Sequence, residues 1–186
     1  MNSLKHTILW RRLDCPGHDS CCLWKTSDSW RLSGTAIFLF DQKPCLFSYE
    51  VNTNINWKTC TANISGYVGK SVVTLAIART PNHYWSINNI ELQEAAGCID
   101  LDLGFTPATN LVAIRRLSLA IGERSQANAA WLDFPDFTLK PLEQHYHRLS
   151  HDRYEYSAPS LDYADVLEVD DYGAIVRYPH LWEQER

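Results

Sequence analysis

Short extended stretches separated by turn residues recur along the whole chain, and this pattern limits the available folds more than any other feature. The stretches are rich in β-branched and aromatic residues or alternate apolar and polar side chains. Turn-forming residues such as Asp14-Cys15-Pro16-Gly17 and Asp41-Gln42-Lys43-Pro44 separate them. This spacing is typical of antiparallel barrels and strongly curved sheets. The sequence predicts strands at residues 7–13, 21–25, 30–40, 45–51, 57–69, 72–79, 84–89, 99–103, 127–133, 138–142, 144–149, 153–157, 163–169 and 174–179.

One segment has the spacing of a helix. Leu111, Ile114, Leu117 and Ile121 recur at helical intervals, and Thr109 or Asn110 is available as the N-cap. A strand over residues 116–120 is the alternative. We therefore predict a mainly β protein, a strongly curved antiparallel sheet or half-barrel of roughly a dozen strands that one short helix plugs or covers.

Length and charge limit the class of protein. A chain of 186 residues without repeats, low-complexity tracts or an obvious linker predicts a single β-rich domain over residues 1–186. The net charge of −5 and the scattered basic residues argue against nucleic-acid binding. Because we find neither a signal peptide nor an apolar run of membrane-spanning length, we expect a cytoplasmic protein that is not integral to a membrane. The oligomeric state stays open.

The six cysteines predict no metal centre. They contain no Cys-x-x-Cys pair, and a cytoplasmic chain of this size does not need them as disulfides. We expect buried or half-buried thiols that act as small apolar side chains, and no cofactor. The cysteines are Cys15, Cys21, Cys22, Cys45, Cys60 and Cys98.

Near the middle of the chain, residues 97–110 combine a short strand with a turn. Alternation places Asp100 and Asp102 on one face of this strand and three aliphatic side chains on the other. Two adjacent carboxylates could bind a divalent cation or act as an acid and a base. The simpler interpretation is a polar strand face that pairs with Arg115 or Arg116 and so anchors the helix.

His145 and His147 form the densest imidazole cluster, because a spacing of two places them on the same strand face. Such a pair could bind a metal with His151 or Asp152 as a third ligand. We favour a solvated hairpin face, because the sequence places no acidic residue beside the pair as a general base. The chain also lacks a Gly-x-Ser-x-Gly elbow and a glycine-rich phosphate loop.

Aromatic residues are numerous, with 7 Trp, 9 Tyr and 6 Phe. Inward-facing rings of a large antiparallel sheet can line a ligand cavity, although they can equally form an ordinary core. The candidates for a cavity wall are Trp10, Tyr49, Trp57, Trp85, Trp131, Tyr146, Tyr154 and Tyr156.

Four segments resemble the bacterial putative glycolipid-binding family: residues 8–13, 47–51, 100–110 and 169–179. The resemblance extends over nearly the whole chain. It implies a single domain with a curved antiparallel sheet, similar to bacterial lipoprotein carriers and mycobacterial glycolipid-binding lipoproteins, in which a half-barrel encloses an apolar cavity. It implies no catalytic residues.

The leading hypothesis is therefore non-catalytic binding of a lipid or glycolipid-like amphiphile. Aromatic and aliphatic residues would bury its apolar part, and polar residues at the rim would hold its head group. Two alternatives are a hydrolase or isomerase that uses Asp100 and Asp102 or the His145 and His147 pair, and a scaffold with an exposed aromatic patch. The rim residues we predict are Asp100, Asp102, Arg115, Arg116 and Arg177.

Overall fold

A single open sheet organises the protein. The computed structural model describes residues 2–186. Its 15 strands follow the order β8-β7-β6-β5-β4-β3-β2-β1-β15-β14-β13-β12-β11-β10-β9, so β8 and β9 are the two edges and the sheet does not close. The strands are β1 Ser3–Arg12, β2 Gly17–Lys25, β3 Ser29–Phe40, β4 Lys43–Asn54, β5 Thr59–Val68, β6 Ser71–Arg79, β7 Trp85–Ile87, β8 Ile90–Leu92, β9 Asp100–Leu103, β10 Arg124–Leu132, β11 Leu139–Arg148, β12 Arg153–Ala158, β13 Tyr163–Val169, β14 Ile175–Tyr178 and β15 Trp182–Gln184.

The predicted fold class is confirmed. Neighbouring strands are antiparallel except for β9, which runs parallel to β10. One helix, α1 (Asn110–Leu117), and a short 3-10 helix (Pro159–Leu161) complete the structure. Neither helix is long and apolar enough to cross a membrane, among the residues that the structure describes.

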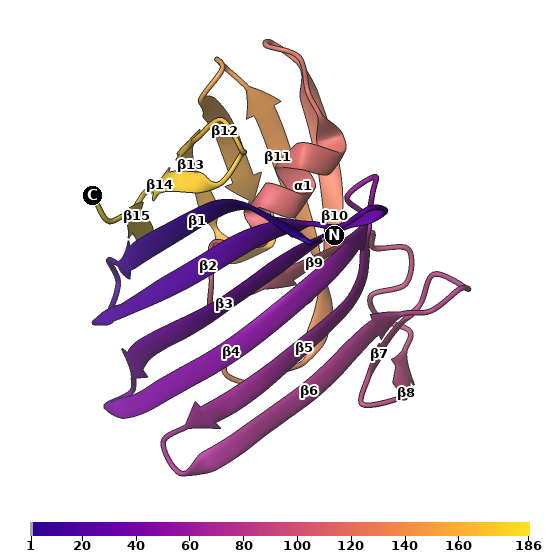
Figure 1. Ribbon diagram of the computed structural model, residues 1–186, viewed down its shortest axis with the longest axis vertical. Helices are drawn as coiled ribbons and strands as arrows, with labels where there is room; N and C mark the ends of the chain where they lie inside the picture. Colours follow the sequence, from indigo (N-terminus) through magenta and orange to yellow (C-terminus); the bar gives the residue numbers. More distant parts are fainter. Residues whose placement is uncertain (1) are drawn as a thin grey trace.

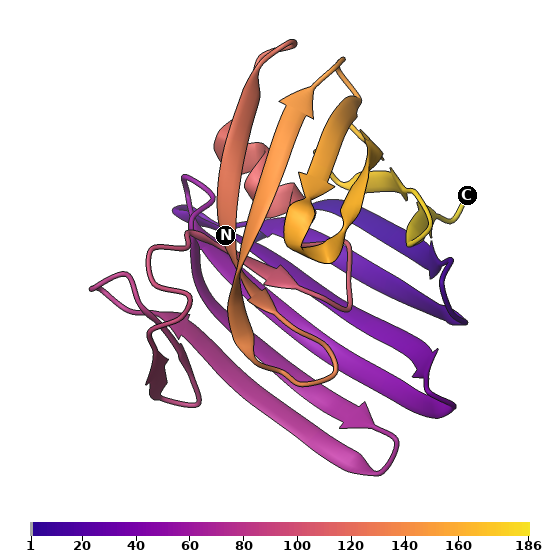
Figure 2. The same ribbon diagram turned by 180° about the vertical axis from the view of Figure 1, so that it is seen from behind.

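The curvature of the sheet produces two walls with α1 between them. Strands β1–β6 form the first wall and β10–β13 the second, and the short strands β14 and β15 join the walls (Figure 1). The reverse view shows the second wall in front of the helix (Figure 2). Leu111 and Val112 of α1 pack with one core cluster, whereas Ala113 and Ile114 pack with the other. The helix therefore lies on the boundary between the two clusters.

Strand alternation decides which side chains enter the core. In β4, Cys45, Phe47, Tyr49 and Val51 are buried, and the residues between them face outward. Close strand packing also requires Gly66 in β5, because a Cβ there would lie 1.8 Å from the carbonyl oxygen of Leu46.

The structure corrects three predicted elements. Residues 138–142 and 144–149 were predicted as two strands, but they belong to one strand, β11. Pro141 does not interrupt this strand and is paired with Ala130 of β10. Of residues 84–89, Trp85–Ile87 forms β7, and Asn88 and Asn89, which both have positive φ, form the turn that leads into β8. The helix ends at Leu117, because Ser118 adopts a left-handed conformation and its N–H binds the carbonyl of Ile114. The alternative strand at 116–120 is not formed.

All six cysteines are free thiols, as expected. Cys21, Cys45 and Cys98 are buried, and Cys15 and Cys22 are half-buried. Cys60 differs from the expectation, because it lies on the outward face of β5 and is exposed.

Candidate functional site

The central stretch predicted as a site lies inside the molecule. Asp100 is 1% exposed, and Leu101 and Leu103 on the opposite face of β9 are also buried. The expectation of a polar outer face is wrong, because β9 lies between the walls and both of its faces meet protein. Its free edge is covered by threonines: the N–H of Leu101 donates to Thr59 Oγ1 at 3.2 Å, and the N–H of Leu103 donates to Thr109 Oγ1 at 3.2 Å.

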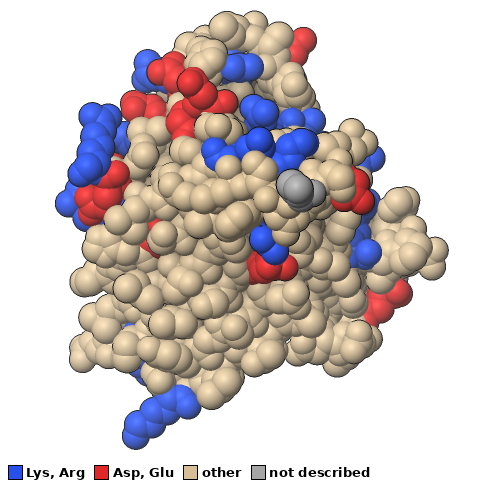
Figure 3. Space-filling view, in the orientation of Figure 1, with Lys and Arg blue, Asp and Glu red and all other residues tan. Residues whose placement is uncertain are grey.

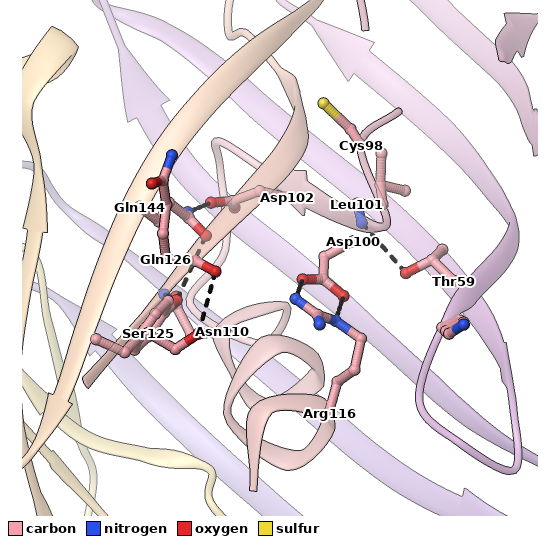
Figure 4. A network of polar contacts seen from close by, with 12 residues as sticks. Thr59, Cys98, Asp100, Leu101, Asp102, Asn110, Arg116, Ser125, Gln126 and Gln144 are labelled. Atoms are coloured by element: carbon pink, nitrogen blue, oxygen red, sulfur yellow. Dashed lines mark hydrogen bonds and ion pairs between the residues drawn. The ribbon is translucent and has the colours of Figure 1, made fainter. Parts of the chain in front are cut away.

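Asp100 anchors α1 through Arg116, which confirms one of the two predicted pairings. The guanidinium donates from Nε and Nη2 to the two carboxylate oxygens, at 2.7 and 2.6 Å (Figure 4). This bidentate geometry is the strong form of such a contact. Burial raises the pKa of Asp100, and Arg116 opposes that rise.

Asp102 has no cationic partner among residues 2–186 and is held by hydrogen bonds to the second wall and to the loop before α1. It accepts from Gln144 Nε2 at 2.6 Å and from Thr109 Oγ1 at 3.1 Å. Gln144 also donates to the Tyr156 hydroxyl, and Asn110 donates to the Tyr146 hydroxyl. Burial raises the pKa of Asp102 to about 6.

The same stretch is also bonded to the first wall. Asp19, on the inward face of β2, accepts hydrogen bonds from the hydroxyls of Thr106 and Tyr49, the latter at 2.9 Å. Burial raises the pKa of Asp19 to about 6. Residues 100–110 therefore connect both walls through buried polar side chains. Asp19, Thr106 and Gln144 were not among the predicted site residues. The alternation of Asp19 with Cys21 and Leu23 in the sequence could have placed Asp19 inside.

His145 and His147 share the outward face of β11, as predicted, but each has an acidic partner. Glu143 lies 2.7 Å from His145 Nε2, and Glu155 lies 2.9 Å from His147 Nδ1. The expectation that no acidic residue lies beside the pair is wrong. His151 lies beyond the pair in the turn between β11 and β12, and residues 2–186 contain no group of three His, Cys, Asp or Glu arranged to hold a metal ion.

Most of the predicted aromatic wall is tightly packed. Trp10, Trp85, Tyr146 and Tyr156 have exposed fractions of 2% or less, and Tyr49 is also buried. A void large enough for water would leave accessible area on the rings around it, so these rings face protein atoms. Trp131 is half-buried and lies against Gly104. In this conformation the side chains form the core, and their role in lining a cavity stays a prediction.

An open groove lies at the C-terminal end of α1. Its volume is about 300 Å³, and it brings together three predicted residues, Trp57, Arg115 and Tyr154. Trp57 stacks on Trp30 with ring centroids 4.4 Å apart, and the Arg115 guanidinium lies 5.6 Å from the Trp57 ring. We call this feature the α1 groove; its polar and aromatic lining consists of Trp57, Arg115, Ser118, Arg148, His151, Tyr154, Asp170 and Asp171.

The α1 groove carries both signs of charge. Arg148 is fixed in place, since its Nη1 donates to the carbonyl of Leu119 at 2.8 Å and its guanidinium lies over Tyr154. Arg115 is exposed and forms no ion pair with any carboxylate of residues 2–186. Asp171 lies on the opposite side, 3.8 Å from His151. Donors, an acceptor and aromatic rings are therefore available in one place.

The remaining predicted rim residues lie elsewhere. Asp100, Asp102 and Arg116 belong to the interior network. Arg177 lines a separate groove on the outside of β14 with Glu168 and Glu183. The structure therefore gathers Arg115 alone of the five predicted rim residues at the α1 groove.

Comparisons with known proteins agree with this architecture. A DUF1089 family protein from Pseudomonas aeruginosa has a crystal structure that is similar, with a TM-score of 0.78, 24% sequence identity, and coverage of 89% of this chain and 91% of that chain. No curated protein matches the sequence. The model of the family described as "Putative glycolipid-binding" matches residues 7–184. The family description favours a binding function, and the match over nearly the whole chain means that this protein belongs to that family.

Proposed function

We propose that the protein binds a glycolipid-like amphiphile without converting it, and that the α1 groove holds the head group. The observation that carries this proposal is the exposed guanidinium of Arg115, which has no ion-pair partner among residues 2–186 and lies beside Trp57. The other arginines near α1 are already engaged: Arg116 by Asp100, and Arg148 by backbone carbonyls.

The chemistry of the groove suits a sugar. Hydroxyl groups both donate and accept hydrogen bonds, so they can use Arg115 and His151 as well as Asp171. The uncovered edges of the Trp57 and Tyr154 rings can contact the apolar C–H surface of a pyranose. A volume of about 300 Å³ lies at the lower end of the range for small-molecule sites, which fits a head group and excludes an acyl chain.

The apolar part of the ligand needs a second location. Ile114 and Val169 line the α1 groove and belong to the second core cluster, whereas Trp57 belongs to the first. The boundary between the clusters therefore reaches the groove. We propose that the acyl or isoprenoid part enters along this boundary, where the predicted rings Trp10, Tyr49, Tyr146 and Tyr156 would form its walls.

A non-catalytic role fits the interior carboxylates. Asp100 and Asp102 both accept hydrogen bonds from protein donors and lie away from the α1 groove, so neither is placed to act on a ligand bound there. The predicted cytoplasmic location is part of the proposal and can be tested by cell fractionation.

The test measures binding of octyl glucoside below its critical micelle concentration, by calorimetry and tryptophan fluorescence. Wild type and Arg177→Ala should bind equally, because Arg177 lies outside the α1 groove. Arg115→Ala should bind about tenfold more weakly, since one hydrogen bond to a charged group contributes roughly 1.5–3 kcal/mol. Arg115 is exposed, so the variant should keep the wild-type midpoint of thermal unfolding.

Native mass spectrometry of the purified protein provides a second measurement, with co-purifying lipid as the expected result. Absence of bound lipid together with no binding across a panel of alkyl glycosides would overturn the function. Equal binding by wild type and Arg115→Ala would instead overturn the α1 groove as the location of the head group.

A further inference from the structure

The outward face of the first wall carries a straight row of hydroxyl groups. Cα partners across five consecutive strands place one serine or threonine in register on each strand. Thr35 Oγ1 and Ser48 Oγ lie 3.3 Å apart, in hydrogen-bond contact. We call this feature the hydroxyl row; it consists of Ser20, Thr35, Ser48, Ser65 and Thr74, all of them exposed.

An apolar row lies directly beside the hydroxyl row. The next outward position on β3–β6 places Ile37 opposite Leu46, Leu46 opposite Tyr67 and Tyr67 opposite Val72. Ile37 is 48% exposed and Val72 is 83% exposed. The two rows together give a strip with one hydrogen-bonding edge and one apolar edge.

The middle of this face is hollowed. A trough of about 600 Å³ crosses β2–β6, and its floor includes the small residues Gly34, Ser48 and Ser65. These small residues on neighbouring strands leave this part of the outward face open.

The trough is almost without charge. In the part of the chain that the structure describes, Glu50 is the one charged residue that lines it, and its carboxylate lies 3.5 Å from Arg31. The space-filling view shows a broad uncharged surface over the first wall (Figure 3). An ionic ligand would find no free counter-charge among the described residues that line the trough.

From this placement we infer that the trough binds a neutral, extended oligosaccharide that runs across the strands. Adjacent strands lie about 4.8 Å apart, so the five hydroxyls span about 19 Å with a repeat close to the length of one sugar unit in an extended β-linked chain. Sugar hydroxyls meet the hydroxyl row, and the C–H edges of the rings extend past the trough over the neighbouring apolar row of Ile37, Leu46 and Tyr67.

The shape and the charge of the protein favour this occupant over a second copy of the chain. The trough offers little charge for a complementary contact, and each copy has a net charge of −5, which opposes self-association. The site is separate from the α1 groove, so it does not depend on the function proposed above.

The experiment is a titration of the purified protein with cellotetraose and cellobiose, followed by calorimetry. Cellotetraose should bind at least tenfold more tightly than cellobiose, because the longer chain contacts the whole row. Ser65→Lys introduces a long charged side chain into the trough and should weaken cellotetraose binding at least tenfold. Thr61→Lys introduces the same side chain on the same face of β5 outside the trough, and should bind as wild type does.

Circular dichroism and thermal unfolding establish that both variants fold, as expected for exposed positions. Failure of cellotetraose to bind, or equal binding by all three proteins, would overturn the inference. Loss of cellotetraose binding in Arg115→Ala would also overturn it, since the saccharide would then occupy the α1 groove. A wild-type dimer in light scattering that Ser65→Lys dissociates would assign the face to a second copy instead.

Discussion

The two walls of the sheet place their polar groups on opposite faces. The first wall is mostly apolar inside, where Asp19 is its buried carboxyl, and hydroxyl-rich outside. The second wall buries polar groups, including Gln144 and the tyrosine hydroxyls, and carries charge outside, as at Glu143 and Glu155. The same period-two alternation therefore gives an outer face with few charges in the first wall and a polar interior in the second.

This difference explains how β9 and α1 are positioned. An apolar interior alone leaves many similar packings, whereas each buried polar group accepts few partners. Asp102 and Asn110 bond to the second wall, and Thr106 bonds to Asp19 of the first. The polar interior of the second wall thus orients the central stretch, and the first wall holds it through Asp19 and Thr59.

Removing the ion pair of the central stretch should have the largest effect on stability. Arg116→Met leaves the Asp100 carboxylate buried without its cation, and breaking a buried pair in this way costs about 3–5 kcal/mol. Urea unfolding at pH 7 should show this decrease in the free energy of unfolding.

The matched control is an exposed pair of the first wall. Lys43 and Asp41 have side chains that are 57% and 73% exposed, so Lys43→Met should change the free energy of unfolding by about 0–1 kcal/mol. A loss below about 1 kcal/mol for Arg116→Met would contradict the role of the pair as the anchor of α1.

Two buried carboxyls should make stability depend on pH in the same direction: Asp19 of the first wall, and Asp102 of β9, which is bonded to the second wall. The pKa values of Asp19 and Asp102 are raised from 3.8 to about 6. The unfolded state therefore loses its proton first as pH rises, and the stability associated with each protonated carboxyl decreases between about pH 4 and 6. A shift of about two pKa units corresponds to about 3 kcal/mol for each group.

Substitution by asparagine removes this titration from one carboxyl at a time. Asp19→Asn and Asp102→Asn should each become more stable relative to wild type as pH rises from 4 to 7, by up to about 3 kcal/mol. Urea unfolding across that range measures the difference. If a variant instead became less stable relative to wild type as pH rises, the native carboxyl would be held in its charged form. The two carboxyls would then no longer share the same pH dependence.

Local pattern predicted the strands well but not their distant partners. Alternation and turn residues gave the fold class, the hairpin at residues 150–152 and the helix, because these depend on neighbours in sequence. The pairing of Asp100 with Arg116 could also be predicted from the sequence, since the two residues are 16 positions apart, in the central stretch and the helix that follows it. The contact of Asp19 with Thr106 joins residues 87 positions apart, and alternation says only that each faces inward.

The candidate site shows the same limit. Glu143 lies two residues before His145 on one strand, so the period of two could have predicted their contact. Trp57 and Arg115 meet at the α1 groove because the loop between β4 and β5 and the end of α1 come together in three dimensions. Inward aromatic residues such as Trp10 and Tyr146 have the same sequence pattern whether they pack or line a cavity.

The last comparison is between the outer face of the first wall and its interior, and the rate at which thiols on each side are modified measures it. We expect the Cys60→Ser substitution to change stability least. Cys60 on β5 is exposed, whereas Cys21 on β2 is buried, and burial raises the pKa of the Cys21 thiol. Since the thiolate is the nucleophile, iodoacetamide at pH 8 should modify Cys60 first and leave Cys21 unmodified in the folded protein. Mass spectrometry of tryptic peptides identifies the modified residue, and Cys60→Ser is the control that removes the fast reaction. Its free energy of unfolding should match wild type within about 0.5 kcal/mol. Modification of Cys21 at the rate of Cys60 would contradict the closed packing, because the interior of the first wall would then open to solvent in the folded state.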